Sequence, residues 1–156
     1  MKRPKPQASK LHIEDYVPSL VNRAGTAMLS YSAREFQQLG LTVPQFRILL
    51  TLWHHDECRF GDLATLTSIE PPTLSRLLNG MAAGKLVKRK RSVEDTRSVT
   101  LSLTAAGRAL FEKVIPFADR CDELYTAGIS ASDLAVLRRT LTAIYHNVRA
   151  ADEKSS

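Results

Sequence analysis

The sequence predicts a mainly α-helical chain with one small β-hairpin, and three observations support this fold class. Apolar residues recur at helical spacing over most of the 156 residues. Residues 98–103 alternate apolar and polar side chains, with Val99, Leu101 and Leu103 on one side, as in a half-buried strand. Residues that favour helix starts precede three of the helical stretches, at Thr42, Thr104 and Ser130.

Four helices are expected in the first half of the chain, over residues 15–39, 43–54, 60–67 and 71–83. Thr42 and Gln45 form a capping-box pattern at the start of the second helix. Gly40 and Gly84 stand where the first and fourth helices are expected to end, and the left-handed cap expected at such ends favours glycine. In the short third helix, the expected buried residues are Leu63, Ala64 and Leu66.

A β-hairpin is expected directly after the fourth helix. Its strands are residues 86–91 and 98–103, and the polar loop 92–97 that joins them is longer than a tight two-residue turn. Two short helices followed by a hairpin are the elements of a winged helix-turn-helix. Residues 41–104 are therefore expected to form one such lobe.

Two long helices are expected after the hairpin. Thr104 would cap the first, which is expected to bend at Pro116. Ser130 and Asp133 form a second capping-box pattern at the start of the other. Its apolar residues lie three and four positions apart, as in a coiled-coil seam: Leu134, Leu137, Leu141, Ile144 and Val148.

The net charge of +6 is unevenly distributed. Residues 71–100 carry seven basic and two acidic side chains, and the first ten residues carry four basic ones. A basic segment within a near-neutral chain is typical of a surface that binds a polyanion. The alternative is a solvated surface with a chance excess of lysine and arginine. The order of elements around the basic segment favours nucleic acid.

The helix over residues 71–83 has two distinct faces. Leucine and methionine form one, with Leu74, Leu77, Leu78 and Met81. The other carries the residues expected to contact DNA, namely Thr73, Ser75, Arg76 and Asn79. Arginine can donate two hydrogen bonds to guanine, asparagine can pair with adenine, and serine or threonine can bind a base edge or a phosphate. The alternative is an ordinary amphipathic surface helix.

The hairpin supplies further candidates for DNA contact. Lys88, Lys90 and Arg91 lie on its first strand, from which side chains on one face could contact phosphates. Arg97, at the tip of the loop, could enter a narrow minor groove, and Asp95 could hold its guanidinium by a charge-assisted hydrogen bond. The alternatives are a turn residue for Asp95 and a solvated charge for Arg97.

Residues Leu41 to Phe111 resemble the MarR (multiple-antibiotic-resistance regulator) family of bacterial transcription factors. The resemblance rests on Leu41-Thr42-Val43-Pro44-Gln45-Phe46, on Pro71-Pro72-Thr73-Leu74-Ser75-Arg76-Leu77, and on the hairpin sequence Asp95-Thr96-Arg97 that precedes Leu103-Thr104-Ala105-Ala106-Gly107. One departure is Glu70, where this family more often has serine or asparagine as the helix cap.

The resemblance implies an obligate homodimer that binds a pseudo-palindromic operator in double-stranded DNA and is released by a small ligand or an oxidant. It implies dimerisation helices over residues 13–40 and 105–150, on either side of the DNA-binding lobe 41–104. Residues 1–12 are expected to be a disordered basic tail. The expected role is transcriptional repression, and the expected compartment is the cytoplasm, since no signal sequence or membrane span is recognised.

An effector pocket, if the chain has one, is expected between the dimer helices and the lobe. Its candidate lining residues are Met28, Tyr31, Phe46 and His54, each of which also suits the plain core. An arginine such as Arg23 or Arg47 could bind a carboxylate, which would favour aromatic acids.

Catalytic and metal sites are not expected, and neither is a cofactor. The sequence lacks a nucleophile elbow, a phosphate-binding glycine loop and a His-Glu-x-x-His motif. Residues 54–58 gather metal-binding side chain types, but neighbours in sequence rarely converge on one ion. Two alternatives stay open: a redox-responsive regulator that uses Cys58 or Cys121, and a winged-helix module that binds proteins or coats DNA without sequence preference.

Overall fold

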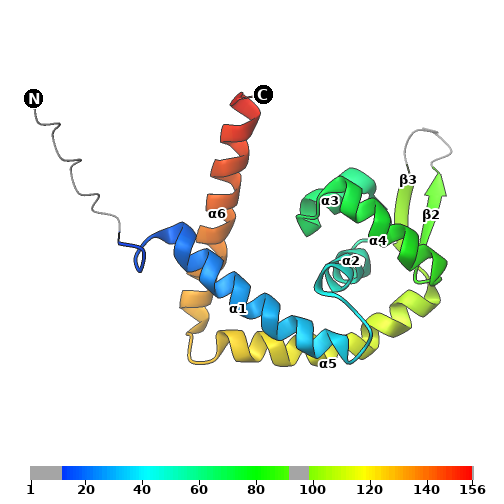
Figure 1. Cartoon of the computed structure of the whole chain (residues 1–156), viewed down its shortest axis with the longest axis horizontal. Coiled ribbons are helices and arrows are strands. Elements are labelled where there is room, and N and C mark those ends of the chain that lie inside the picture. The colour runs from blue at the N-terminus through cyan, green and yellow to red at the C-terminus, as the bar shows by residue number, and fades with distance from the viewer. Residues whose placement is uncertain (1–11, 92–98, 156) are drawn as a thin grey trace, which may run out of the picture. The chain divides into compact units, whose positions relative to one another are not determined.

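The computed structural model describes residues 12–91 and 99–155. The chain forms two compact units, residues 1–121 and 122–156. The elements are α1 (Val17–Gln37), α2 (Val43–His54), β1 (Cys58–Arg59), α3 (Phe60–Thr67), α4 (Pro71–Ala83), β2 (Val87–Arg91), β3 (Val99–Leu103), α5 (Ala105–Thr126) and α6 (Ala131–Ser155) (Figure 1). The predicted fold class, mainly helical with a small β-hairpin, is confirmed.

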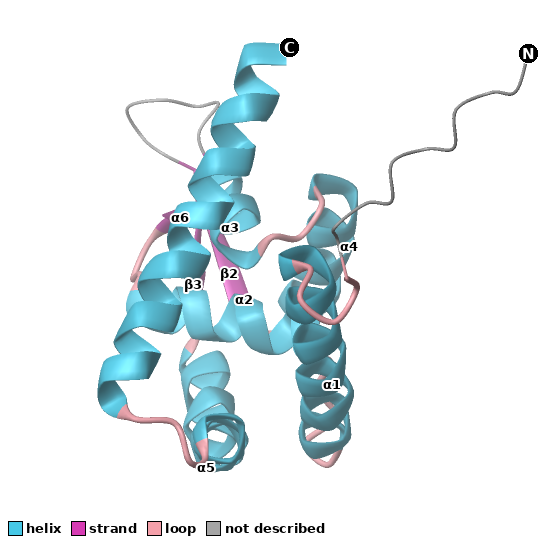
Figure 2. Ribbon diagram, turned by 90° about the vertical axis from the view of Figure 1, so that its left-hand side faces the viewer, coloured by secondary structure: helices cyan, strands magenta, loops and turns pink. Residues whose placement is uncertain are grey.

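The hairpin belongs to an antiparallel sheet of three strands in the order β1-β3-β2. Strands β2 and β3 run side by side in Figure 2 and pair Val87 with Leu103 and Arg89 with Leu101. The third strand, β1, pairs Cys58 with Leu101 and was not predicted. Its two residues are too few to show an alternating pattern, so only its partner in the fold reveals it.

Local capping sets the helix starts as predicted. The Gln45 backbone N–H donates to Thr42 Oγ1 at 3.4 Å, and the Thr42 N–H donates to Gln45 Oε1 at 2.9 Å. At the start of α6 the Asp133 N–H likewise donates to Ser130 Oγ at 3.1 Å. Each bond satisfies a backbone group that the first helical turn leaves without a partner. Helix α5 continues through Pro116.

Thr104 joins α5 to the sheet. Its Oγ1 accepts from the Gly107 N–H at 3.0 Å, and its own N–H donates to the Leu86 carbonyl at 3.0 Å. A Cβ atom on Gly107 would collide with the Leu86 carbonyl oxygen. Glycine at position 107 therefore allows the close approach of α5 to the start of β2.

The helix ends were predicted less well than the starts. Gly40 has φ +68°, as expected of a residue in a left-handed turn. Gly84, however, has φ −75°, and the left-handed residue is Lys85, with φ 57°. The expected left-handed cap at Gly84 is wrong by one position. The turn closes through the Leu86 N–H, which donates to the Met81 carbonyl at 2.8 Å.

The buried side of α3 was also predicted incorrectly in part. Leu63 is fully buried as expected, but Leu66 is 57% exposed and Thr67 is buried in its place. Residues four apart share one face of a helix, so Leu63 and Thr67 point to the core together. The Thr67 hydroxyl donates to the Leu63 carbonyl at 2.6 Å, which satisfies its hydrogen bond inside the core.

One core holds the first unit together. Helix α2, which is apolar nearly all round, lies at its centre with Ile48, Leu49 and Leu52 fully buried. Aromatic rings extend the core to the neighbouring helices: Phe46 of α2 stacks on Phe36 of α1, with ring centroids 4.3 Å apart. The lobe is thus anchored to the end of α1 by close side-chain contact.

Candidate nucleic-acid interface

Helix α4 presents one buried and one exposed face. Leu74, Leu78 and Met81 are fully buried, and Leu77 is half-buried. The four residues predicted to contact DNA are all exposed: Thr73, Ser75, Arg76 and Asn79. Pro71 and Pro72 occupy the first turn, where a missing N–H has little cost. The structure thus assembles on one surface the polar set that the sequence suggested.

Glu70 occupies the N-cap position of α4, and in the described structure its side chain makes no capping hydrogen bond. The helix start is therefore fixed by the two prolines and by the Leu74 N–H, which donates to the Glu70 carbonyl at 2.9 Å. This backbone bond explains how the helix begins at Pro71 as predicted despite the departure from the family pattern.

Strand β2 lies against α4 (Figure 1), and the described basic side chains of β2 are exposed. Lys88, Arg89 and Lys90 are exposed, whereas Val87 is buried. Because side chains alternate along a strand, Arg89 shares the face of Val87, and the two lysines share the opposite face. The alternation divides the basic side chains between two surfaces.

Arg89 contacts helix α4 directly. Its Nη2 donates to Asn79 Oδ1 at 2.8 Å. Arg89 was not among the predicted site residues. The signal that could have found it is the period-two spacing from Val87, since an apolar residue of this strand must face the helix that covers it.

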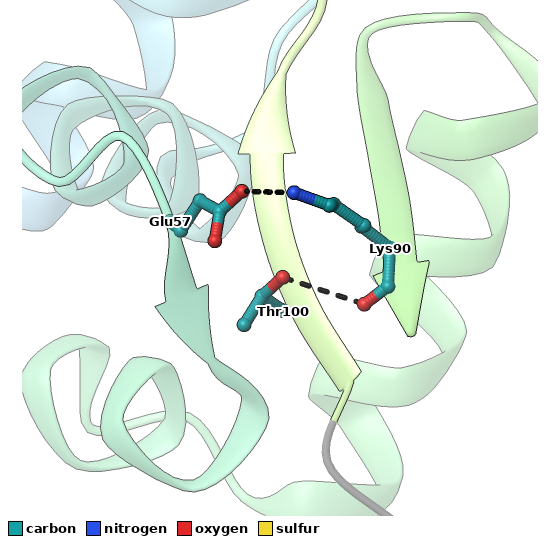
Figure 3. A network of polar contacts seen from close by, with 3 residues as sticks. All are labelled: Glu57, Lys90 and Thr100. Atoms are coloured by element: carbon teal, nitrogen blue, oxygen red, sulfur yellow. Dashed lines mark hydrogen bonds and ion pairs between the residues drawn. The ribbon is translucent and has the colours of Figure 1, made fainter. Parts of the chain in front are cut away.

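Lys90 lies on the opposite face of the strand, beside an acidic residue. Its Nζ contacts Glu57 Oε1 at 3.2 Å, and the Thr100 hydroxyl donates to the Lys90 carbonyl at 3.3 Å (Figure 3). The lysine and glutamate side chains are 67% and 54% exposed. Exposed pairs of this kind contribute roughly 0–1 kcal/mol. A phosphate could therefore compete with Glu57 for this ammonium group.

The rest of the predicted hairpin site lies outside what the structure describes. Arg91 ends β2, but its side chain is outside the described part, and so are Asp95 and Arg97. A charge-assisted bond between Asp95 and Arg97 stays a prediction.

The four candidate effector residues are dispersed. Phe46 stacks between Phe36 and Phe111, with ring centroids at 4.3 and 6.2 Å. Tyr31 is half-buried, with the Arg34 guanidinium 5.5 Å from its ring centroid. Met28 and His54 are exposed.

A cavity of about 570 Å³ lies between the end of α1 and the start of α2. Its lining is mostly apolar and contains one arginine: Leu29, Ala33, Gln37, Leu41, Thr42, Val43, Pro44 and Arg47. None of the four candidate effector residues contributes to this lining. Arg47, which sequence analysis named as a carboxylate partner, does.

The two cysteines are buried free thiols. Burial, with a smaller contribution from the Asp62 carboxylate, raises the pKa of the Cys58 thiol. The thiolate is the reactive form of cysteine, so this environment lowers the reactivity of Cys58. Within residues 12–91 and 99–155, no group of three histidine, cysteine or acidic side chains is placed to hold a metal ion. Nor is any helix in these ranges long and apolar enough to cross a membrane.

A family model described as transcriptional regulator SarA/Rot matches residues 31–114 of this chain. The organic hydroperoxide resistance transcriptional regulator of Bacillus subtilis is 38% identical over 78 residues. That match spans 50% of this chain and only 53% of the relative.

Solved structures are similar over nearly the whole chain. A MarR family transcriptional regulator from Silicibacter pomeroyi superposes with a TM-score of 0.80 at 29% identity, covering 91% of this chain and 96% of its own. Bordetella bronchiseptica BpsR, whose DNA binding is regulated by 6-hydroxynicotinic acid, gives a TM-score of 0.78 at 25% identity, with coverage of 88% and 98%.

The matched family and these structures are transcriptional regulators, not enzymes. The predicted resemblance to MarR proteins is confirmed, and the prediction that the chain is not an enzyme is confirmed with it. The chain belongs to the SarA/Rot family of transcriptional regulators and has the winged-helix fold of MarR family proteins.

Proposed function

We propose that this chain is a homodimeric repressor that binds an operator sequence-specifically and loses affinity when a small acidic ligand binds. The observation that carries the proposal is the exposed polar face of α4 beside the basic strand β2. In the proposed complex, α4 enters the major groove. Arg76 reads guanine, Thr73 and Ser75 contact base edges or phosphates, and Lys88 and Lys90 contact the backbone.

Exposed apolar side chains on the terminal helices support the homodimer. On α1 these are Val17, Leu20, Val21, Met28 and Leu29. On α6 they are Val136, Leu137, Leu141, Tyr145 and Val148. Apolar patches of this kind usually mark an interface. In the proposed dimer a second copy covers both helices. The two α4 helices of the dimer, one from each chain, bind successive major grooves roughly 34 Å apart.

The proposed effector site is the cavity beside Arg47. Its apolar lining suits an aromatic ring, and the guanidinium suits a carboxylate. The similarity to BpsR, whose DNA binding is regulated by 6-hydroxynicotinic acid, supports an aromatic acid as the ligand class. A ligand that prefers the dimer conformation with the lower operator affinity shifts the population toward it, and the loss in affinity is limited by the ligand's difference in binding to the two conformations.

An oxidant-responsive regulator is the weaker alternative. The Bacillus subtilis relative is named for organic hydroperoxide resistance, but the match spans half of each chain. In this chain Cys58 and Cys121 are buried, and the raised pKa of Cys58 disfavours the thiolate that reacts with peroxides. The burial of both thiols therefore favours a small ligand, rather than an oxidant, as the signal that releases DNA.

The test is a titration of the purified protein on the DNA upstream of its own gene and on scrambled duplex of equal length, at several salt concentrations. The proposal predicts a preference of at least about 10³-fold for the upstream DNA. Equal and steeply salt-dependent binding to both duplexes would contradict sequence-specific regulation at that site. No binding to either would favour a protein-interaction module instead.

A further inference from the structure

We infer that Arg89 is a specificity-determining residue. It fixes the orientation of the Asn79 side-chain amide and thereby determines which base Asn79 binds. The inference rests on the proposed DNA-binding function and concerns one position of the operator. Asparagine on a recognition helix is expected to pair with adenine. The contact between strand β2 and helix α4 changes that expectation.

The position of Arg89 beside Asn79 follows from the packing of the lobe. Val87 of β2 is buried in the same core as Leu78 of α4, so the strand is held against the helix. The Leu86 N–H donates to the Met81 carbonyl at 2.8 Å, which fixes the turn between the two elements. Within this frame, the Arg89 guanidinium reaches the amide of Asn79 at 2.8 Å while both residues stay exposed.

Hydrogen-bond chemistry then fixes which way the amide points. A guanidinium has only donors, whereas an amide has one acceptor oxygen and one NH₂ donor. If the Asn79 amide were turned by 180°, its NH₂ group would oppose the guanidinium, donor against donor. Arg89 therefore holds the oxygen toward itself. The NH₂ group is left pointing away from Arg89 as the part of Asn79 that can bind a base.

The orientation has a direct consequence for base choice. Pairing with adenine needs the amide oxygen to accept from N6 while the NH₂ donates to N7. With its oxygen held by Arg89, Asn79 acts mainly as a donor. Guanine, with acceptors at N7 and O6, and thymine, with an acceptor at O4, match a donor. Cytosine presents a donor at N4 and is disfavoured.

The simpler role for Arg89 is a phosphate contact that ignores sequence. The two roles are separated by comparing Arg89→Met with Lys88→Met. Both variants remove one positive charge from an exposed position of β2. Lys88 lies on the opposite face of the strand from Arg89, so only the first variant frees the amide of Asn79.

The experiment measures the affinity of the full-length protein for a set of duplexes that carry each of the four base pairs at every operator position. Arg89→Met is expected to raise the preference for adenine over guanine about tenfold at one position and to leave the preferences elsewhere unchanged. Lys88→Met is expected to lower affinity for all duplexes by a common factor.

Repeating the comparison in an Asn79→Ala background completes a double-mutant cycle. There, Arg89→Met is expected to leave every base preference unchanged, because the amide that it controls is absent. A uniform loss of affinity for Arg89→Met, or the same adenine shift in the Asn79→Ala background, would overturn the inference while operator recognition stands. If the unmodified protein does not distinguish operator from scrambled duplex, the proposed function fails and the inference fails with it.

Discussion

The winged lobe and the terminal helices use their apolar residues in opposite ways. In the lobe, α2, α3 and α4 bury theirs in one shared core, with Leu52, Leu63 and Leu78 fully enclosed. Helix α6, in contrast, leaves Leu137 and Leu141 more than 40% exposed. These lobe residues are therefore covered within one chain, whereas we propose that the exposed apolar residues of the terminal helices are covered by a second copy.

The largest effect is expected from placing charge on the exposed seam of α6. Leu137→Glu combined with Leu141→Glu should abolish the dimer, because two carboxylates would be buried without partners at the proposed interface. Sedimentation should then give the mass of one chain, 17.3 kDa. Arg139→Glu makes the same change in charge on the face of α6 opposite Leu137 and Leu141, so it is the control and should stay dimeric. An unchanged mass for the double variant would place the interface elsewhere.

The second test addresses the core of the lobe. Leu78→Ala should lower the free energy of unfolding by about 2–5 kcal/mol, because it leaves a cavity where a fully buried side chain stood. Leu66→Ala removes the same atoms from a side chain that is 57% exposed and should have a much smaller effect. Denaturant titration of both variants measures the difference. Equal losses would mean that Leu66 is covered in the native protein.

Alanine substitutions at two glycines test the junction between the lobe and α5. Gly107→Ala should destabilise the fold by roughly 1–3 kcal/mol, because the added methyl group meets the Leu86 carbonyl and α5 must shift. Gly80→Ala, inside α4 with nothing within 4 Å of its added methyl, should stabilise the helix by up to about 1 kcal/mol. Thermal or denaturant unfolding reports both, and opposite signs are expected. If both variants were destabilised, the space beside Gly80 would not be open in the native protein.

The smallest expected effect concerns the contact between Glu57 and Lys90. Glu57→Gln should raise operator affinity by up to about fivefold, because it releases the Lys90 ammonium for a phosphate. Glu112→Gln removes an exposed carboxylate from α5 and controls for the change in net charge. Titration at low salt measures both variants. An equal gain for the two would show that Lys90 is not specifically released.

The elements that the sequence predicted well are those with local causes. The capping box at Thr42, the side-chain cap at Ser130 and the prolines that open α4 act within one helical turn, so their helices begin as predicted. The burial of Leu74, Leu78 and Met81 follows from helical periodicity alone. These are properties that a short window of sequence contains.

The features that sequence analysis missed depend on contacts between distant segments. Strand β1 exists only because Cys58 and Arg59 pair with β3, some forty residues later. The burial of Thr67 rather than Leu66 depends on how an eight-residue helix packs against its neighbours. The bond from Arg89 to Asn79 requires β2 to lie against α4. Local spacing can place Arg89 on one face of β2, but it does not specify which distant segment packs against that face.

The most direct test of the central claim compares Arg76→Ala with Lys90→Ala on the operator, its base variants and scrambled duplex over a range of salt concentrations. If the exposed face of α4 reads sequence, Arg76→Ala should relax the preference at one base pair by roughly 1–3 kcal/mol. Lys90→Ala should weaken binding to every duplex alike and reduce the salt dependence. Equal losses on every base variant for Arg76→Ala would contradict the assignment of α4 as the recognition helix.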